Sequence, residues 1–275
     1  MPPNTGNFTT NDGVDIAYTT WGTDGPAVVL VHGWSGSRHF FRDSVQSLSR
    51  KCRVFAFDLR GHGESGKPSW GAHVARLAAD LRDFLVAMNL SSVTGVGTSL
   101  GCAVLWSYLE LFGQQDRLAR CVFVDQAPLQ YKFEGDWEHG SNGCYNAECL
   151  AGLRARLLTD LAGCAKDTVK GCMQRPTPEQ VDFFSAETLK ADGAFLGALM
   201  ADHTQLDWRP LLPKINLPCL VMVGRKSQCF PWQGVQYVAD NIPGAQAIVF
   251  EEGDHWLYIE EPDRFADAVL DFVLK

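Results

Sequence analysis

The sequence has no apolar run long enough to span a membrane, and its first ten residues have neither the basic nor the apolar part of a secretory signal peptide. We therefore expect no membrane partner and a cytoplasmic location. Basic residues are also in deficit, since 24 lysines and arginines face 32 aspartates and glutamates, for a net charge of -8. Without a basic cluster to override this balance, the sequence argues against nucleic acid as a partner.

Several cofactor and metal signatures are absent as well. The chain contains no paired CxxC motif, no GxGxxG fingerprint, no phosphate-binding loop and no histidine pair at helical spacing. We therefore expect neither a cofactor nor a metal ion. Nine cysteines are present, an odd number, and most are expected to be free thiols. Four of them lie within residues 144–172, where the sequence leaves open one disulfide or one redox-sensitive pair.

The first half of the chain alternates between strand and helix patterns. Continuous apolar runs at 27–32 and 53–58 are typical of strands buried on both faces of a parallel sheet. Residues 73–89 carry apolar side chains at helical spacing, and 121–125 is another strand-like run. With 275 residues and 46% hydrophobic residues, the chain can bury a sizeable core. The alternation predicts an α/β fold with a mainly parallel sheet covered on both faces.

The pattern changes over residues 129–212. No strand-like run occurs there, and amphipathic helical segments such as 147–161 and 178–200 dominate. We therefore predict a core formed by residues 1–128 and 213–275, with a helical cap inserted at 129–212.

A candidate nucleophile lies at the turn between a β-prone and a helix-prone run. Residues 97–101 read Gly-Thr-Ser-Leu-Gly, which is the Gly-x-Ser-x-Gly pattern of a nucleophile elbow. The two glycines allow strand and helix to approach closely at a sharp turn. The same pattern also occurs in ordinary glycine-rich turns. Other motifs in the chain are therefore needed to distinguish an elbow from such a turn.

A candidate base follows the last predicted strand. His255 lies in a Gly-Asp-His turn at 253–255. Imidazole has an ordinary pKa of about 6.5, so it can take up and return a proton near neutral pH. A serine hydroxyl needs such a base to become a nucleophile. We predict Ser99 as nucleophile and His255 as general base.

Four motifs in sequence give the chain a family resemblance. They are His-Gly-Trp at 32–34, Asp-Leu-Arg-Gly-His-Gly at 58–63, the elbow at Ser99 and Gly-Asp-His at 253–255. In this order and over almost its whole length, the chain resembles the α/β-hydrolase fold family. The resemblance implies a mostly parallel eight-stranded sheet, helices on both faces and a helical cap between strands six and seven.

The sequence identifies the third predicted catalytic residue, the acid, less directly. Many members of the family carry an aspartate in a Gly-x-x-Asp turn after strand seven, but residues 224–227 read Gly-Arg-Lys-Ser. A serine cannot stabilise an imidazolium as a carboxylate does. The resemblance offers the end of strand six instead, where Asp125 stands. Two alternatives stay open. Asp125 caps the turn into the cap, and His255 works with no partner or with a glutamate that the sequence does not place; or Asp254 serves His255 despite being its neighbour in the chain.

The resemblance also supplies an oxyanion hole. It assigns the backbone N–H groups of Leu100, after the nucleophile, and Trp34, after the His-Gly pair, and we expect the Trp34 side chain to wall the pocket. The cap carries apolar side chains that either pack or face the cleft, and those we predict to line the pocket are Trp137, Phe184, Met200 and Trp208. A mostly apolar pocket would suit a small or medium acyl, lactone or aromatic substrate.

These features predict a cofactor-free serine hydrolase that cleaves a carboxylic ester or lactone, with a small molecule as its only expected partner. The scaffold supports other chemistries. A cofactor-independent dioxygenase would use the same histidine to deprotonate a heteroaromatic substrate. C–C bond hydrolysis and a perhydrolase side activity need the same three residues. A ligand-binding receptor with a slow triad is the non-enzymatic alternative. The sequence leaves the oligomeric state open.

Overall fold

The computed structural model describes residues 3–275 and contains an eight-stranded sheet, as predicted. Its strands are β1 (Asn4–Thr9), β2 (Asp15–Trp21), β3 (Ala27–Val31), β4 (Arg53–Phe57), β5 (Val93–Thr98), β6 (Leu118–Val124), β7 (Cys219–Gly224) and β8 (Gln246–Phe250). The strand order is β1-β2-β4-β3-β5-β6-β7-β8. β2 pairs antiparallel with β1 and β4, and every pair from β4 to β8 is parallel.

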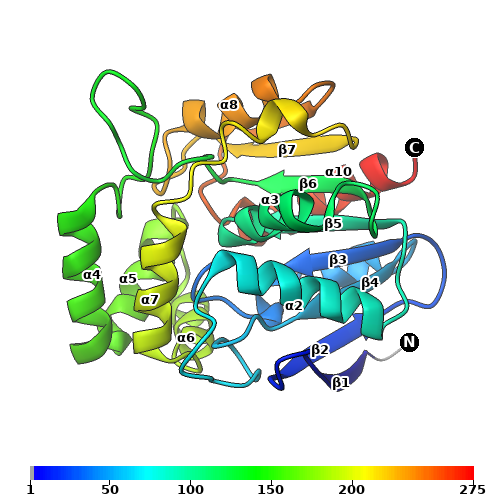
Figure 1. Cartoon of the computed structure of the whole chain (residues 1–275), viewed down its shortest axis with the longest axis horizontal. Coiled ribbons are helices and arrows are strands. Elements are labelled where there is room, and N and C mark those ends of the chain that lie inside the picture. The colour runs from blue at the N-terminus through cyan, green and yellow to red at the C-terminus, as the bar shows by residue number, and fades with distance from the viewer. Residues whose placement is uncertain (1–2) are drawn as a thin grey trace.

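Helices cover both faces of this sheet (Figure 1). The α-helices are α1 (Val45–Leu48), α2 (Val74–Ala87), α3 (Leu100–Phe112), α4 (Ala147–Thr159), α5 (Leu161–Cys172), α6 (Pro178–Thr188), α7 (Gly193–His203), α8 (Trp232–Asn241), α9 (Leu257–Glu260) and α10 (Pro262–Val273). Short 3-10 helices occur at η1 (Arg38–Phe41) and η2 (Leu212–Lys214). Within residues 3–275, no helix is long and apolar enough to cross a membrane.

The continuous apolar runs follow from this two-sided burial. Successive side chains of a strand point to opposite faces. In β3, Val29 and Val31 therefore join the core beneath α2, α3 and α8, whereas Val28 and Leu30 join the core beneath α1 and α10. Figure 1 shows α2 and α3 in front of the sheet and α10 behind it. Because both faces of a strand such as β3 are buried, apolar side chains occupy both alternate sets of positions.

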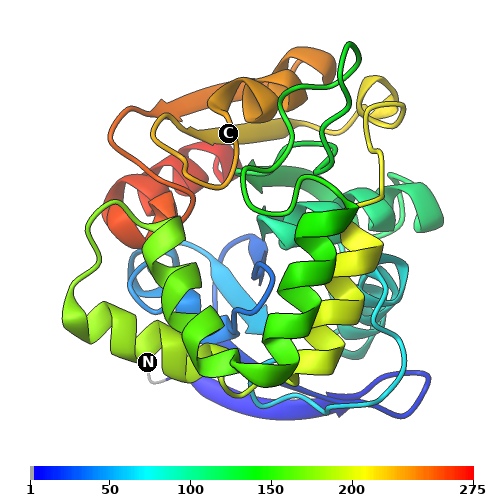
Figure 2. The same cartoon turned by 90° about the vertical axis from the view of Figure 1, so that its left-hand side faces the viewer.

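The helices between β6 and β7 lie beyond the carboxyl ends of the parallel strands, and Figure 2 shows α4 to α7 facing the viewer at that end. The two predicted helical segments are present, with interruptions. The predicted segment 178–200 is divided into α6 and α7, because Asp192 caps α7 by accepting a hydrogen bond of 2.7 Å from the N–H of Phe195. Residues 129–146 precede the first of these helices and form no helix of their own.

The cap is tied to the loop that follows β3. The indole Nε1–H of Trp34 donates to the carbonyl oxygen of Leu196 in α7 at 3.0 Å. The hydroxyl of Ser37 donates to Oε2 of Glu187 in α6 at 2.7 Å, and both side chains are buried. These two bonds hold the cap against one wall of the site described next.

Candidate active site

Ser99 lies on a sharp turn between β5 and α3. Its backbone angles are φ 52° and ψ -123°, a conformation that costs a non-glycine residue roughly 1–3 kcal/mol. A Cβ on Gly97 would lie 2.4 Å from the carbonyl oxygen of Gly101, and a Cβ on Gly101 would lie 2.2 Å from that of Val31. Only glycine fits at both positions, as the sharp strand-to-helix turn of the predicted elbow requires.

Asp125 and His255 are brought together from positions 130 residues apart. Asp125 follows the last residue of β6, and its Oδ2 lies 2.7 Å from Nδ1 of His255. The N–H of Gly224 donates to Oδ1 at 2.9 Å. Because a carboxylate only accepts hydrogen bonds, Nδ1 of His255 carries a proton in either charge state, and in the neutral ring Nε2 keeps its lone pair. This arrangement favours Asp125 over Asp254, whose oxygens bind other groups, among them the side chain of Gln228 at 2.6 Å.

A residue that the sequence reasoning passed over completes the acid's surroundings. The hydroxyl of Ser227 donates to Oδ2 of Asp125 at 2.6 Å. Ser227 occupies the fourth position of the Gly-x-x-Asp turn, where the sequence showed only that a carboxylate is missing. The signal that could have found it is the retained Gly224 followed by a small hydrogen-bonding side chain at that fourth position.

Gln126 is a second residue that the sequence reasoning did not select. The Ser99 hydroxyl donates to Oε1 of Gln126 at 3.5 Å, and the amide Nε2 of Gln126 donates to the carbonyl of Ala127 at 2.8 Å. Ser99 and His255 line the same cavity. Proton transfer from Ser99 to His255 therefore requires the hydroxyl to turn from Gln126 towards Nε2, and such catalytic hydrogen bonds commonly tighten only when substrate binds.

The electrostatics of His255 reflect its burial and its partners. Burial disfavours the imidazolium, but neighbouring negative charge more than offsets this and raises the pKa of His255 above its ordinary value. The hydrogen bond with Cys172 and burial raise the pKa of the Cys229 thiol well above its usual range, so Cys229 is neutral near pH 7. Asp125 is therefore the charge that stabilises a protonated His255.

The resemblance assigns an oxyanion hole to the backbone N–H groups of Leu100 and Trp34, and both residues lie on segments that flank Ser99. Leu100 is the first residue of α3, and Trp34 lies in the loop after β3. A Cβ on Gly33 would lie 3.0 Å from the Cβ of Ser99, which shows how closely this loop passes the nucleophile. Neither N–H donates a backbone hydrogen bond within residues 3–275. Both are therefore available to an oxyanion.

His32 holds this loop in place. Its Nδ1 lies 2.8 Å from the carbonyl oxygen of Gly33, and its Nε2 accepts a hydrogen bond of 3.0 Å from the N–H of Leu59. Burial lowers the pKa of His32 to about 4, so the ring is neutral and can accept at Nε2 near pH 7. The His-Gly-Trp motif is thus a brace between the ends of β3 and β4.

A cavity of about 450 Å³ lies between the cap and the sheet. Ser99, His255 and Trp34 line it, and so does Met200, one of the four cap side chains selected from the sequence. The volume lies within the range of small-molecule sites.

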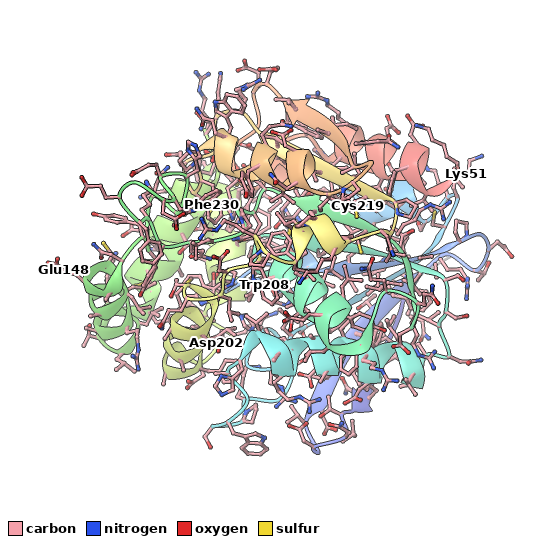
Figure 3. The ribbon with its side chains drawn as sticks, turned by 45° about the horizontal axis from the view of Figure 1, so that its top comes forward. Lys51, Glu148, Asp202, Trp208, Cys219 and Phe230 are labelled. Carbon is pink, nitrogen blue, oxygen red and sulfur yellow. The ribbon has the colours of Figure 1, made fainter. Side chains whose placement is uncertain are left out.

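The other three selected cap side chains require correction, because the structure places each in a packed core rather than on the cavity wall. The ring of Trp137 packs 5.1 Å from that of Tyr237. Phe184 lies 4.8 Å from Phe40, centroid to centroid. Trp208, labelled in Figure 3, packs 6.2 Å from Trp106 of α3.

His203 lines the cavity as well. It lies at the end of α7, is 2% exposed, and neither ring nitrogen has a hydrogen-bond partner within residues 3–275. Burial lowers the pKa of His203 to about 3, which keeps the ring neutral. An unpartnered polar side chain at a cavity wall can serve a polar group of a bound molecule.

Comparison with known proteins agrees with this fold. A sequence model described as "Alpha/beta hydrolase family" matches residues 28–268. A non-heme chloroperoxidase of Kitasatospora aureofaciens is 28% identical over 97% of this chain and 98% of its own. Two solved structures share the fold at 24% identity over 98% of this chain: an esterase from Exiguobacterium antarcticum, with a TM-score of 0.91 and 99% of its chain covered, and a bromoperoxidase from Bacillus anthracis, with a TM-score of 0.90 and 100% covered. The chain belongs to the α/β-hydrolase family.

Proposed function

We propose that the protein is a cofactor-free serine hydrolase of the carboxylesterase or lactonase type. The observation that carries this proposal is the 2.7 Å contact between Asp125 and His255 in the cavity that also contains the elbow serine, Ser99. A nucleophile, a base and an acid that orients the base are the parts that acyl transfer requires.

In the acylation step, Oγ of Ser99 attacks the carbonyl carbon of the substrate while Nε2 of His255 takes the hydroxyl proton. The carbonyl oxygen becomes negatively charged and accepts hydrogen bonds from the N–H groups of Trp34 and Leu100. Asp125 stabilises the imidazolium that forms. His255 then returns the proton to the leaving oxygen, which departs as an alcohol or, for a lactone, as the hydroxyl of the opened ring.

In the deacylation step, His255 takes a proton from water as the water oxygen attacks the acyl carbon. The same two N–H groups receive the second oxyanion, and the proton passes to Oγ of Ser99 as the acid leaves. Every proton that His255 accepts is returned within the cycle, so no other reactant is needed.

The cavity supports a small or medium substrate with few polar groups. Apolar side chains such as Leu153, Phe230 and Trp256 form much of its wall. His203 is a buried polar group on that wall, and its ring nitrogens have no hydrogen-bond partner among residues 3–275.

Perhydrolysis is the second candidate, and the 28% identical chloroperoxidase relative favours it. Hydrogen peroxide would replace water in attacking the acyl-enzyme, giving a peracid and free Ser99 with no change in proton count. A peracid that oxidises halide in solution would then appear as haloperoxidase activity. Acetate-dependent halogenation of a diketone reporter by peroxide tests this candidate directly.

The main test combines labelling and turnover. Intact-mass spectrometry after treatment with a small fluorophosphonate should show one adduct on the wild type and none on Ser99→Ala. Hydrolysis of p-nitrophenyl acetate should fall at least about 1000-fold in Ser99→Ala and His255→Ala, and by a comparable factor in Asp125→Asn. The matched control is Ser91→Ala, which removes an exposed hydroxyl outside the cavity. Equal labelling of Ser99→Ala and wild type would contradict the proposal.

A further inference from the structure

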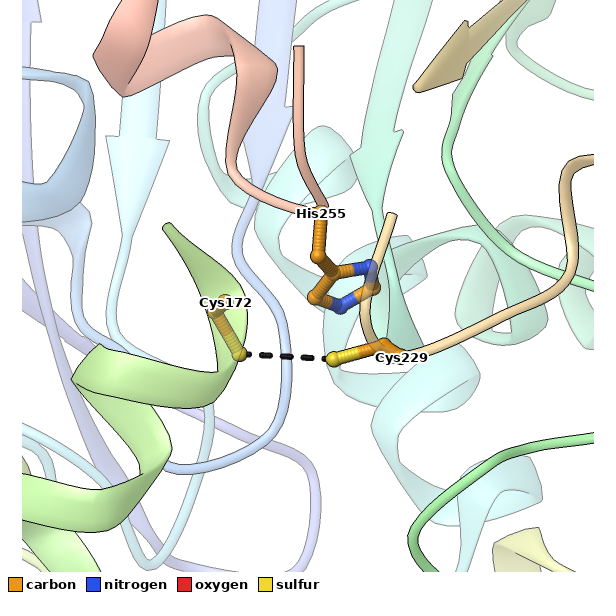
Figure 4. A group of neighbouring side chains, drawn as sticks. All are labelled: Cys172, Cys229 and His255. Atoms are coloured by element: carbon orange, nitrogen blue, oxygen red, sulfur yellow. Dashed lines mark hydrogen bonds between the residues drawn. The ribbon is translucent and has the colours of Figure 1, made fainter. Parts of the chain in front are cut away.

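Two thiols lie beside the imidazole of His255. Cys172 ends α5 of the cap, Cys229 follows β7, and their sulfur atoms are 3.5 Å apart. One ligand atom from each of these two thiols and from His255 lies within 4.8 Å of the other two. Figure 4 shows a ring nitrogen of His255 directed at the Cys229 sulfur. Since Nδ1 faces Asp125, this nitrogen is Nε2.

The spacing of the sulfur atoms suits a tetrahedral metal ion. With zinc–sulfur bonds of about 2.3 Å, two thiolates on one tetrahedral zinc lie about 3.8 Å apart. The observed 3.5 Å is therefore within a few tenths of an ångström of that separation. Thiolate and imidazole ligands favour zinc over calcium or magnesium, which prefer oxygen ligands.

The surroundings of His255 are also those of a zinc ligand. A ligating histidine usually donates its other ring N–H to a carboxylate, which fixes the tautomer and orients the ring. Asp125 takes that N–H at 2.7 Å and leaves the Nε2 lone pair free. All three candidate ligands line the cavity, so a fourth position would face its interior.

We propose that Cys172, Cys229 and His255 form a binding site for one Zn²⁺ ion, with water as the fourth ligand. Binding releases the two thiol protons to solvent, and no electron is transferred. The three ligands come from the cap and from two separate loops of the core. The ion therefore joins the end of α5 to the sheet as well as occupying the cavity.

Bound zinc would also oppose hydrolysis. The Nε2 lone pair that coordinates zinc is the one that Ser99 needs as its proton acceptor. Zinc is therefore an inhibitor of this enzyme that competes for the catalytic base. This consequence depends on the proposed function, whereas the binding itself does not.

Binding is measured on the full chain, reduced and treated with chelator, by competition with a chromophoric zinc indicator. We expect one tight equivalent for wild type, and a loss of affinity of more than about 100-fold in Cys172→Ser, Cys229→Ser and the double variant, since even outer partners of ligands contribute about 10–100-fold. Cys144→Ser is the matched control, because Cys144 is a buried thiol that lines the same cavity outside the trio. Unchanged affinity in the double variant would overturn the proposal.

Cobalt substitution identifies the ligands without relying on activity. Co²⁺ in the wild type should give a sulfur-to-cobalt charge-transfer band and the intense visible bands of a tetrahedral ion, and Cys229→Ser should weaken both. Circular dichroism confirms that each variant is folded. The contrary outcome is that the reduced protein binds no metal, while peroxide lowers the mass of the wild type by two hydrogens and joins Cys172 to Cys229. The pair then forms a disulfide, and the zinc proposal fails.

The inhibition test is kept separate. The ratio of p-nitrophenyl acetate turnover with and without zinc is compared within each variant, so differences in basal rate cancel. Wild type and Cys144→Ser should be inhibited at the same zinc concentration. The Cys172→Ser and Cys229→Ser variants should be inhibited only at a zinc concentration at least about 100-fold higher. A protein that binds zinc as expected but never hydrolyses an ester would refute the proposed function and leave the metal site standing.

Discussion

The Ser227 hydroxyl donates a hydrogen bond of 2.6 Å to Oδ2 of Asp125, the same oxygen that lies 2.7 Å from Nδ1 of His255. Many members of the family carry the acid in the turn after β7. Here that turn supplies a hydroxyl, which contacts Asp125 rather than His255 itself. We therefore predict that Ser227 is a positioning residue, which acts on His255 through Asp125.

Removing this hydroxyl should slow turnover without weakening substrate binding. Hydrogen bonds to a charged group contribute about 1.5–3 kcal/mol, so Ser227→Ala should lower kcat roughly 10- to 100-fold and leave KM nearly constant. Steady-state kinetics with p-nitrophenyl esters measure both constants. Ser227→Thr, which keeps a hydroxyl, should retain most of kcat. A rise in KM alone in Ser227→Ala would show that the serine acts on the substrate instead.

The acid should be movable from one strand end to the other. Asp125→Asn should reduce kcat by about 10⁴. In the Asp125→Asn background, Ser227→Asp places a carboxylate beside the position of the removed Asp125 carboxylate. We expect this second substitution to raise kcat at least about tenfold over that of Asp125→Asn. Ser227→Asp alone should be slower than wild type, because two carboxylates would then compete for one site. A folded double variant with no recovery would contradict this account of the turn.

His203 should make the protein sensitive to acid. Its pKa is about 3 in the folded protein and 6.5 as the ordinary value, so the unfolded chain binds more protons between these limits and stability falls as the pH drops through them. Between pH 6.5 and pH 4.5 this one group should cost about 2–3 kcal/mol. Urea unfolding at both pH values should show a smaller loss in His203→Phe than in wild type.

The control for that experiment is His139→Phe, which replaces a partly exposed histidine between β6 and β7. Its stability should follow the wild type across the same pH range. Identical pH dependence in His203→Phe and wild type would show that the ring is not kept neutral by burial.

The elbow glycines should be intolerant of one added methyl group. In Gly101→Ala the new Cβ meets the backbone oxygen of Val31 at 2.2 Å, and backbone cannot give way as a flexible side chain can. We expect a loss of about 3 kcal/mol or more in unfolding free energy, measured by thermal or urea denaturation. Gly152→Ala, in the exposed helix α4 with no atom within 4 Å of the added Cβ, should instead stabilise by up to about 1 kcal/mol. Equal effects at the two positions would contradict the packing argument.

What the sequence could predict was set by local rules. The apolar runs of β3 and β4 predicted a sheet buried on two faces, and Ser99 and His255 followed from motifs that are contiguous in the chain. Asp125 came from the resemblance to the family, which offered the end of strand six for the acid. Parallel strands deliver their carboxyl ends to one edge, so Asp125 and Ser99 could be placed together without coordinates.

The remainder depends on contacts between distant segments. Helical periodicity says that Trp137 and Trp208 are buried, but not whether the buried side meets the cavity or the core, and both meet the core. Cys172 and Cys229 belong to a cap helix and a core loop, and no spacing in the chain relates them. Gln126 could be recognised only once the direction of the Ser99 hydroxyl was known.

The bond between the Trp34 indole and the carbonyl of Leu196 fastens the Trp34 ring to α7, and the backbone N–H of the same residue is one of the two proposed oxyanion donors. A cap that swings outward to admit a bulky molecule must either break this bond or drag the amide away from the carbonyl it should polarise. We therefore expect the cap to limit substrate size. A molecule too large for the closed cavity would reach Ser99 only in a state that has lost one of the two proposed oxyanion donors.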